Sequence, residues 1–281
     1  MVMLGLARSL IGSRYPWVPD GPARRTGRPQ ADPDGVPDGT PCTTVRHVPL
    51  ALKDVSVNFG GVRAVSDASL AACAGHVTGL IGPNGAGKTT LFNVISGMIS
   101  PSTGRVSLGG RDITKMATHK RARNGIARTF QRLELFASLS VFENIQVAAE
   151  IAKRASPRQV AGELLERVGI SSVSNTPAGD LPTGTARLLE VARALATEPQ
   201  VLLLDEPASG LDRDESSRLG GLLRELASSD IAVLLVEHDV ELVMEICDRL
   251  FVLDLGRIIA SGHPSEVRQQ PEVIEAYLGA G

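Results

Sequence analysis

Short apolar runs alternate with helical patterns along most of the chain. The runs in "HVTGLIG", "QVLLLDEP" and "IAVLLVEHD" are nearly continuous, which is typical of parallel strands buried on both faces. Between them, apolar residues recur at helical spacing, and in "ARLLEVARALA" they form one face made of Leu188, Val191, Ala192 and Leu195. Strands that alternate with helices predict an α/β fold that binds ligands at the carboxyl ends of its strands.

Weaker patterns predict the remaining elements between residue 49 and the end of the chain. Alternating polarity indicates strands, a glycine pair indicates a hairpin turn, and apolar residues three or four apart indicate helices. The expected elements are a strand at 50–61, a helix at 88–98, a hairpin at 104–113, a helix at 151–168 with a loop at Ser156–Pro157, a helix at 216–229, two strands at 248–262 and a short helix at 272–279.

The first 48 residues differ in composition from the rest. They contain seven of the 17 prolines of the chain, together with several arginines. Such a proline density opposes both helix and strand, so residues 1–48 are predicted to be a disordered extension before a domain at 49–281. No apolar run approaches the roughly 20 residues that a membrane-spanning helix needs.

The net charge of the chain indicates which classes of macromolecule it can bind. The 281 residues carry a formal net charge of −2, and acidic and basic side chains are nearly balanced. Nucleic-acid-binding proteins usually show a basic excess, so no nucleic-acid partner is expected.

The segment "GPNGAGKTT" fits the pattern Gly-x-x-x-x-Gly-Lys-Ser/Thr between a predicted strand and a predicted helix. Glycines permit positive φ and let phosphates approach the main chain, while successive N–H groups and the helix N-terminus attract anions. Lys88 is expected to reach the β and γ phosphates of a nucleotide, and the Thr89 hydroxyl to ligate Mg²⁺. The residues expected to contact the nucleotide are Gly82, Pro83, Asn84, Gly85, Ala86, Gly87, Lys88, Thr89 and Thr90.

Polar residues follow two of the buried strands. Asp205 and Glu206 end "VLLLDE", and His238 follows "LLVE". An aspartate beside a phosphate loop can hold Mg²⁺, and the next residue can orient or deprotonate a water molecule. His238 is expected to point into the same pocket and to connect Glu206 with the γ-phosphate.

These residues resemble, in their order, the ATP-binding subunits of ABC transporters over residues 50–279. "NFGGVRAV" is similar to the loop that contacts adenine, with Phe59 on the base, and "RTFQ" is similar to the Q-loop, with Gln131 reaching the metal and the attacking water. "SGLD" is similar to the D-loop, with Asp212 facing a partner subunit, and His238 matches the switch histidine. The phosphate loop and "VLLLDEP" correspond to the Walker A and Walker B motifs.

The resemblance implies a P-loop NTPase core, with a mostly parallel sheet flanked by helices, an antiparallel β-subdomain and a helical subdomain at about 132–195. It implies ATP and Mg²⁺ as cofactors, membrane permease subunits as partners, a second ATPase subunit, and a peripheral position on the cytoplasmic face of the plasma membrane. A heterodimer is expected, with a homodimer as the alternative. Apolar residues after Gln131 are expected to be mostly core, and a subset to form a groove for a permease helix.

A narrower resemblance concerns the solute. "GIARTFQRLELFASLSVFENIQVA", "VEHDVELVMEICDR" and "PEVIEAYLG" are similar to the ATPases of branched-chain amino-acid uptake systems, which are fed by an extracytoplasmic solute-binding protein. Importers of amides or urea, and exporter ATPases with similar bodies, share such stretches.

One motif departs from the family pattern. The family signature is usually Leu-Ser-Gly-Gly-Gln, and this chain has "LPTGT" at 181–185. Pro182 replaces the serine, Thr183 follows it, and only Leu181 and Gly184 match. Proline has neither a hydroxyl nor an N–H, so the signature is expected to cap the partner's ATP weakly. The alternative function is therefore a nucleotide-binding regulatory subunit with little hydrolysis.

Overall fold

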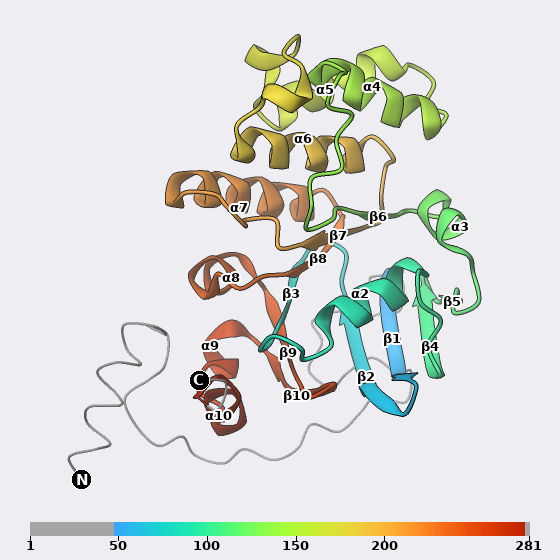
Figure 1. Ribbon diagram of the computed structural model, residues 1–281, viewed down its shortest axis with the longest axis vertical. Coiled ribbons are helices and arrows are strands. Elements are labelled where there is room, and N and C mark those ends of the chain that lie inside the picture. Colours follow the sequence, from blue (N-terminus) through green and yellow to red (C-terminus); the bar gives the residue numbers. More distant parts are fainter. Residues whose placement is uncertain (1–47, 279–281) are drawn as a thin grey trace, which may run out of the picture.

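The structure is a computed structural model that describes residues 48–278 of the 281-residue chain. The extension predicted over residues 1–48 lies outside the described residues except for Val48, whose side chain is buried. Two sheets and a group of helices make up this part of the chain (Figure 1). No helix among the described residues is both long and apolar enough to cross a membrane.

The central sheet has six strands in the order β10-β9-β3-β8-β7-β6. Five of them run parallel, and β10 pairs antiparallel with β9. All residues of β3, β7 and β8 are buried, which confirms the interpretation of the continuous apolar runs. The strands are β3 (Val77–Ile81), β6 (Ile126–Arg128), β7 (Val201–Asp205), β8 (Ala232–Val236), β9 (Arg249–Asp254) and β10 (Arg257–Gly262).

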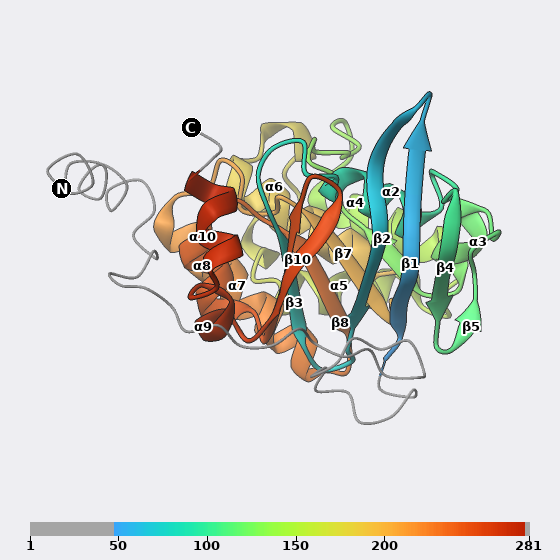
Figure 2. The same ribbon diagram turned by 90° about the horizontal axis from the view of Figure 1, so that it is seen from below.

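The second sheet is antiparallel, with the order β2-β1-β4-β5 (Figure 2). Its strands are β1 (Leu50–Phe59), β2 (Val62–Ala72), β4 (Thr103–Leu108) and β5 (Arg111–Asp112). Gly109 and Gly110 form the turn of the predicted hairpin, both with positive φ. Together with the parallel sheet and the helices, this sheet confirms the predicted fold class.

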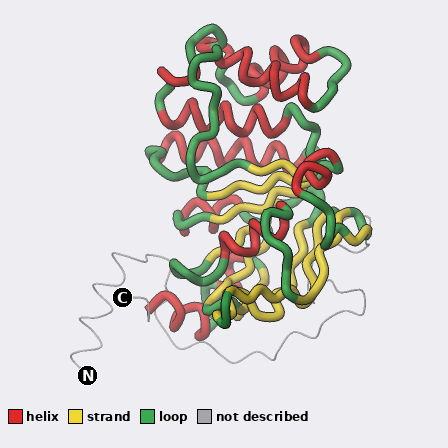
Figure 3. The backbone as a smooth tube through the Cα atoms, turned by 45° about the vertical axis from the view of Figure 1, so that its right-hand side comes forward, coloured by secondary structure: helices red, strands yellow, loops and turns green. Residues whose placement is uncertain are grey.

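Helices cover the sheets and extend beyond the parallel sheet on the side of its edge strand β6 (Figures 1 and 3). On that side α4, α5 and α6 pack together, while α7 lies between them and the sheet. The helices are α2 (Lys88–Ser96), α3 (Thr118–Arg123), α4 (Val141–Ile151), α5 (Pro157–Arg167), α6 (Thr183–Leu195), α7 (Arg213–Ser228), α8 (Val240–Ile246), α9 (Pro264–Val267) and α10 (Pro271–Leu278).

One predicted helix boundary is wrong. The pattern at 151–168 was expected to be helical except for a loop at Ser156–Pro157. In the structure α4 ends at Ile151, residues 152–156 are not helical, and Pro157 is the first residue of α5. Proline suits that position because its missing N–H would have no intrahelical partner there.

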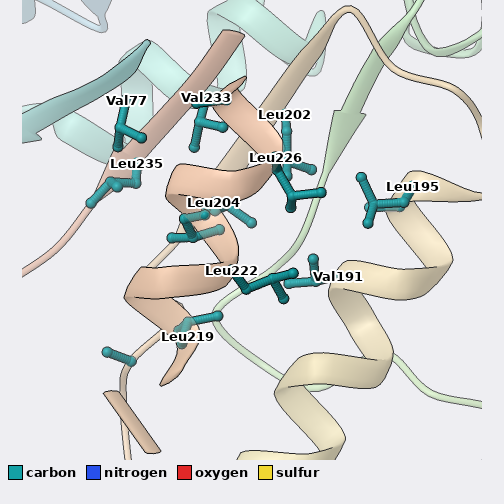
Figure 4. Packing of buried hydrophobic residues seen from close by; sticks show 14 of the residues in the cluster. Val77, Val191, Leu195, Leu202, Leu204, Leu219, Leu222, Leu226, Val233 and Leu235 are labelled. Atoms are coloured by element: carbon teal, nitrogen blue, oxygen red, sulfur yellow. The ribbon is translucent and has the colours of Figure 1, made fainter. Parts of the chain in front are cut away.

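The apolar face predicted for α6 is confirmed at Val191, Ala192 and Leu195, which are buried, whereas Leu188 is only half-buried. Val191 and Leu195 of α6 pack towards the sheet residues Leu202 and Leu204, with Leu222 of α7 among them (Figure 4). This cluster fixes α6 and α7 on the sheet that carries the polar strand ends. Burial of these apolar side chains contributes roughly 25 cal/mol per Å² and keeps α6, α7 and the strand ends in fixed positions relative to one another.

Candidate active site

The phosphate loop joins β3 to α2 as predicted. Gly87 is the N-cap of α2 in the left-handed conformation, with no side chain capping the helix and no acidic residue in its first turn. The first intrahelical hydrogen bond runs from the Leu91 N–H to the Gly87 carbonyl, 3.0 Å. The earlier N–H groups of the turn have no intrahelical acceptor, so this helix end suits an anion.

The three glycines of the loop have different functions. A Cβ on Gly82 would lie 1.9 Å from the Leu253 carbonyl oxygen, and one on Gly87 would lie 2.6 Å from the Ala64 carbonyl oxygen. Both therefore allow the loop to pack against its own chain. Gly85 has φ of 79° and nothing within 4 Å of its ideal Cβ, so its open side is accessible to a phosphate.

Lys88 lies buried beneath this loop. Its Nζ donates to the carbonyl oxygens of Gly82 at 2.6 Å and Pro83 at 2.9 Å. Burial lowers the pKa of Lys88, and the nearby carboxylates of Glu206 and Asp205 partly oppose that shift. An ammonium group has three donors, so one donor remains for a phosphate oxygen.

Glu206 is held between two of the predicted residues. The Nε2 atom of His238 lies 2.7 Å from Glu206 Oε1, and Gln131 Nε2 donates to Glu206 Oε2 at 2.8 Å. The Glu206 backbone has φ of 50°, and its N–H donates to the Val236 carbonyl on β8. Because β8 lies between β3 and β7, the ends of these three strands bring the phosphate loop, His238 and Glu206 to one edge of the sheet.

The residues predicted to hold Mg²⁺ are compatible with that ion. Asp205 Oδ2 accepts from Arg128 at 3.0 Å, whereas no described residue bonds to Asp205 Oδ1, to the Thr89 hydroxyl or to Gln131 Oε1. Mg²⁺ usually takes one or two protein oxygens and completes its shell with water and phosphate oxygens. The described residues contain no cluster of three His, Cys, Asp or Glu side chains that could hold a metal ion.

Buried charged residues missed by the sequence interpretation support this arrangement. Arg187 donates to the carbonyl oxygens of Phe130 and Gln131, at 3.1 and 2.7 Å, and pairs with Glu190 at 3.0 Å. Glu237 accepts the Ala208 N–H at 2.6 Å and the His238 N–H at 3.0 Å. Two signals were available: opposite charges three apart within an apolar helix, and a third acid at the end of a buried strand.

Other predicted residues lie on neighbouring elements. Pro182 is the N-cap of α6, Thr183 is its first residue, and a Cβ on Gly184 would lie 2.3 Å from Glu215 Oε1. Asp212 caps α7 by accepting the Glu215 N–H at 2.8 Å. Among the described residues, no hydrogen bond or ion pair joins these side chains to Lys88 or Glu206.

Phe59 ends β1 with 48% of its surface exposed. Its contact with adenine and the contact of Asp212 with a partner stay predictions.

Comparison with known proteins places this geometry in a family. Residues 65–209 match the ABC transporter family, and residues 257–281 match the branched-chain amino acid ATP-binding cassette transporter family. The high-affinity branched-chain amino acid transport ATP-binding protein BraF of Pseudomonas aeruginosa is 40% identical, with 82% of this chain and 97% of BraF covered. The lipopolysaccharide export system ATP-binding protein LptB of Haemophilus influenzae is 35% identical, with the same shares covered.

A solved structure agrees with these relatives. The ADP conformation of MJ1267, an ATP-binding cassette of an ABC transporter, is 31% identical, has a TM-score of 0.75, and covers 83% of this chain and 99% of that chain. These three comparisons thus reach nearly the full length of the relatives. The residues that match the ABC transporter family include the phosphate loop and the end of β7. This chain belongs to the family of ATP-binding subunits of ABC transporters.

Proposed function

We propose that the chain binds ATP with Mg²⁺ and hydrolyses it to drive import of branched-chain amino acids or related solutes through a membrane permease. The observation that carries the proposal is the placement of Glu206, held by His238 and Gln131, at the sheet edge that carries Lys88. The alternative of a nearly inactive regulatory subunit is not favoured, since the chain's own hydrolytic residues lie together.

Each residue has a defined task in this proposal. Lys88 and the N–H groups of the loop bind the phosphates, while Thr89, Asp205 and Gln131 offer oxygens to Mg²⁺, which would neutralise phosphate charge. Glu206 accepts a proton from the attacking water. Each carboxylate oxygen can accept two hydrogen bonds, so the bonds from His238 and Gln131 orient Glu206 and leave acceptor sites for that water.

The relatives support import of branched-chain amino acids, and a cleft beside the Q-loop supports docking on a permease. The name of BraF specifies branched-chain amino acid transport, and residues 257–281 match a family named for the same solutes. The cleft has a volume of about 300 Å³ and is lined in part by Phe130, Phe136 and Ile151, all of which are exposed. A permease helix is its expected occupant. The subunit would lie peripherally on the cytoplasmic face of the plasma membrane, and a solute-binding protein outside would deliver the solute.

The signature favours pairing with a different ATPase subunit. Pro182 offers no side-chain hydrogen bond at the N-terminus of α6, so ATP bound opposite it loses the bond that serine supplies in the family. Losing one charge-assisted bond costs about 1.5–3 kcal/mol, or roughly ten- to a hundredfold in turnover. A second subunit with an intact signature would complete the site built by Lys88 and Glu206. A homodimer would contain two weak sites.

The test is ATP hydrolysis by the assembled complex. Glu206→Gln is expected to reduce turnover by about 10²- to 10⁴-fold, because the amide cannot accept the proton of water. Glu245→Gln, the same change at an exposed position on α8, is the matched control and is expected to turn over normally. Wild-type turnover no faster than that of Glu206→Gln, with permease and partner present, would exclude a hydrolytic subunit.

The transported solute needs its own measurement. Vesicles that contain the complex and enclose ATP are expected to take up labelled leucine when the solute-binding protein is outside. Vesicles with Glu206→Gln are the control. ATP-dependent uptake of other solutes but not of leucine, isoleucine or valine would contradict the solute class while leaving hydrolysis in place.

A further inference from the structure

Arg128 connects the two sides of the nucleotide site. It is the last residue of β6, three positions before Gln131. Its Nη2 donates to Asp205 Oδ2 at the end of β7, and its Nη1 donates to Asn93 Oδ1 at 2.7 Å and to Ser96 Oγ at 3.1 Å. Asn93 and Ser96 belong to α2, the helix that begins at the phosphate loop. One guanidinium group therefore joins the strand that carries Asp205 to that helix.

The surroundings hold this guanidinium in place. The rings of Phe92 and Phe130 flank it, with centroids 5.6 and 5.0 Å from its central carbon. The side chains of Arg128 and Asp205 are each only 8% exposed. The attraction within a buried ion pair offsets the cost of desolvating the two charges only poorly. Such a pair therefore contributes little to the free energy of folding, and its geometry needs another explanation. The planar fork of arginine can bridge two fixed partners, which a flexible ammonium cannot do.

The bridge determines which part of Asp205 is free. Oδ2 is occupied by Arg128, while Oδ1 has no hydrogen-bond partner among the described residues. We propose that Arg128 is a positioning residue: it fixes the Asp205 carboxylate against α2 so that Oδ1 is available to Mg²⁺. The inference rests on the proposed function, because it concerns the metal that accompanies ATP.

Two physical effects of removing Arg128 have opposite signs. Loss of a positive charge close to Asp205 would, by Coulomb attraction alone, strengthen binding of a divalent cation. Loss of the bridge would leave the carboxylate free to rotate, and removing such outer-shell partners typically weakens metal binding by about 10- to 100-fold. The sign of the change therefore distinguishes a positioning residue from a competing cation.

The experiment measures metal binding rather than turnover. Mn²⁺ is titrated into protein saturated with the slowly hydrolysed analogue AMP-PNP, and free Mn²⁺ is followed by electron paramagnetic resonance. Arg128→Met is expected to weaken Mn²⁺ affinity by about tenfold or more. Its AMP-PNP affinity in EDTA is expected to match wild type, because Arg128 bonds to none of residues 82–90. Arg123→Met, the same change at an exposed site on α3, is the control. Unchanged or tighter Mn²⁺ binding by Arg128→Met would overturn the proposal.

A second variant shows whether the effect passes through Asp205. In an Asp205→Asn background, Arg128→Met is expected to cause no further loss of Mn²⁺ affinity, and a further loss would overturn the proposal. If Arg128→Met does not fold, Arg128→Lys decides, because it keeps the charge but cannot bridge both partners. Weaker Mn²⁺ binding is again expected, and wild-type affinity would refute the role. A wild-type protein that binds no AMP-PNP would instead contradict the proposed function itself.

Discussion

Removing Arg187 should loosen the segment that carries Gln131 and leave a buried acid without its partner. The side chains of Arg187 and Glu190 are 8% and 5% exposed. Arg187 also holds the carbonyl oxygens of Phe130 and Gln131, while Glu190 Oε1 accepts the Glu134 N–H at 3.0 Å. Arg187→Met thus removes three bonds from the Gln131 segment and from Glu190 at once.

The expected loss follows from these contacts. Removing one partner of a buried ion pair costs about 3–5 kcal/mol in the free energy of unfolding, mainly because the other charge stays buried. Burial raises the pKa of Glu190, and Arg187 is among the groups that oppose this shift. Without Arg187 the pKa rises further, and a carboxyl whose folded pKa lies above its unfolded value stabilises the fold only while it is protonated. The loss should therefore be larger at about pH 8 than at about pH 5.

The assay is urea unfolding at both pH values, with Arg123→Met as the control for loss of an exposed arginine. Arg187→Met/Glu190→Gln should recover most of the stability, because the glutamine oxygen can still accept the Glu134 N–H and no charge remains buried. A loss below about 1 kcal/mol, an equal loss at both pH values, or additive effects of the two substitutions would refute the reasoning.

Three further outcomes follow from the site. Glu237→Gln should lower the free energy of unfolding in urea by about 1–3 kcal/mol. The substitution replaces one carboxylate oxygen, which accepts a buried N–H such as that of Ala208, with an NH₂ group that can only donate. Burial lowers the pKa of Lys88, so AMP-PNP affinity should decline with rising pH before the pH reaches about 10.4, the pKa of an exposed lysine. Lys88→Arg should remove this decline. Gly87→Ala should cost about 1–3 kcal/mol in thermal unfolding because of its φ of 107° and a blocked Cβ, and Gly85→Ala should cost less because its Cβ has open space.

The sequence predicted the elements whose pattern is local. The strands β3, β7 and β8 are continuous apolar runs because both faces of the parallel sheet are covered. β2 was not predicted, because it is rich in alanine and its register with β1 is interrupted where Asp54 and Asp67 adopt positive φ. β6 has only three residues and is a strand by virtue of its pairing with β7.

The helix α4 was missed although its start is visible in the sequence. Ser140 accepts the Glu143 N–H, and the Glu143 carboxylate accepts the Ser140 N–H, which is a capping box. The spacing Ser-x-x-Glu before an apolar run predicts such a helix start.

In the candidate site, too, residues with a local sequence pattern were predicted, and features that depend on long-range contacts were not. Asp205, Glu206 and His238 were predictable because each lies at the end of a buried strand or just after it, and parallel strands end at one edge of a sheet. The order of the strands, with β8 between β3 and β7, was not predictable, since no local pattern encodes it. Arg187 and Glu237 were missed because their functions depend on contacts with main-chain groups far away in sequence.

The helix α6 connects the unusual signature to the residues that are proposed to hydrolyse the chain's own ATP. Its first intrahelical bond runs from the Ala186 N–H to the Pro182 carbonyl, so the N–H groups of Thr183, Gly184 and Thr185 stay available to an anion. Main-chain donors and the helix dipole thus survive the loss of the signature serine. In the proposed dimer, that loss would weaken the partner's ATP site without abolishing it. In the middle of the same helix, Arg187 holds the main chain of Gln131, whose side chain binds Glu206. In the proposed dimer, a shift of α6 towards the partner's ATP would therefore move Gln131 at the chain's own site, and a weak signature would reduce coupling between the two sites as well as affinity at one.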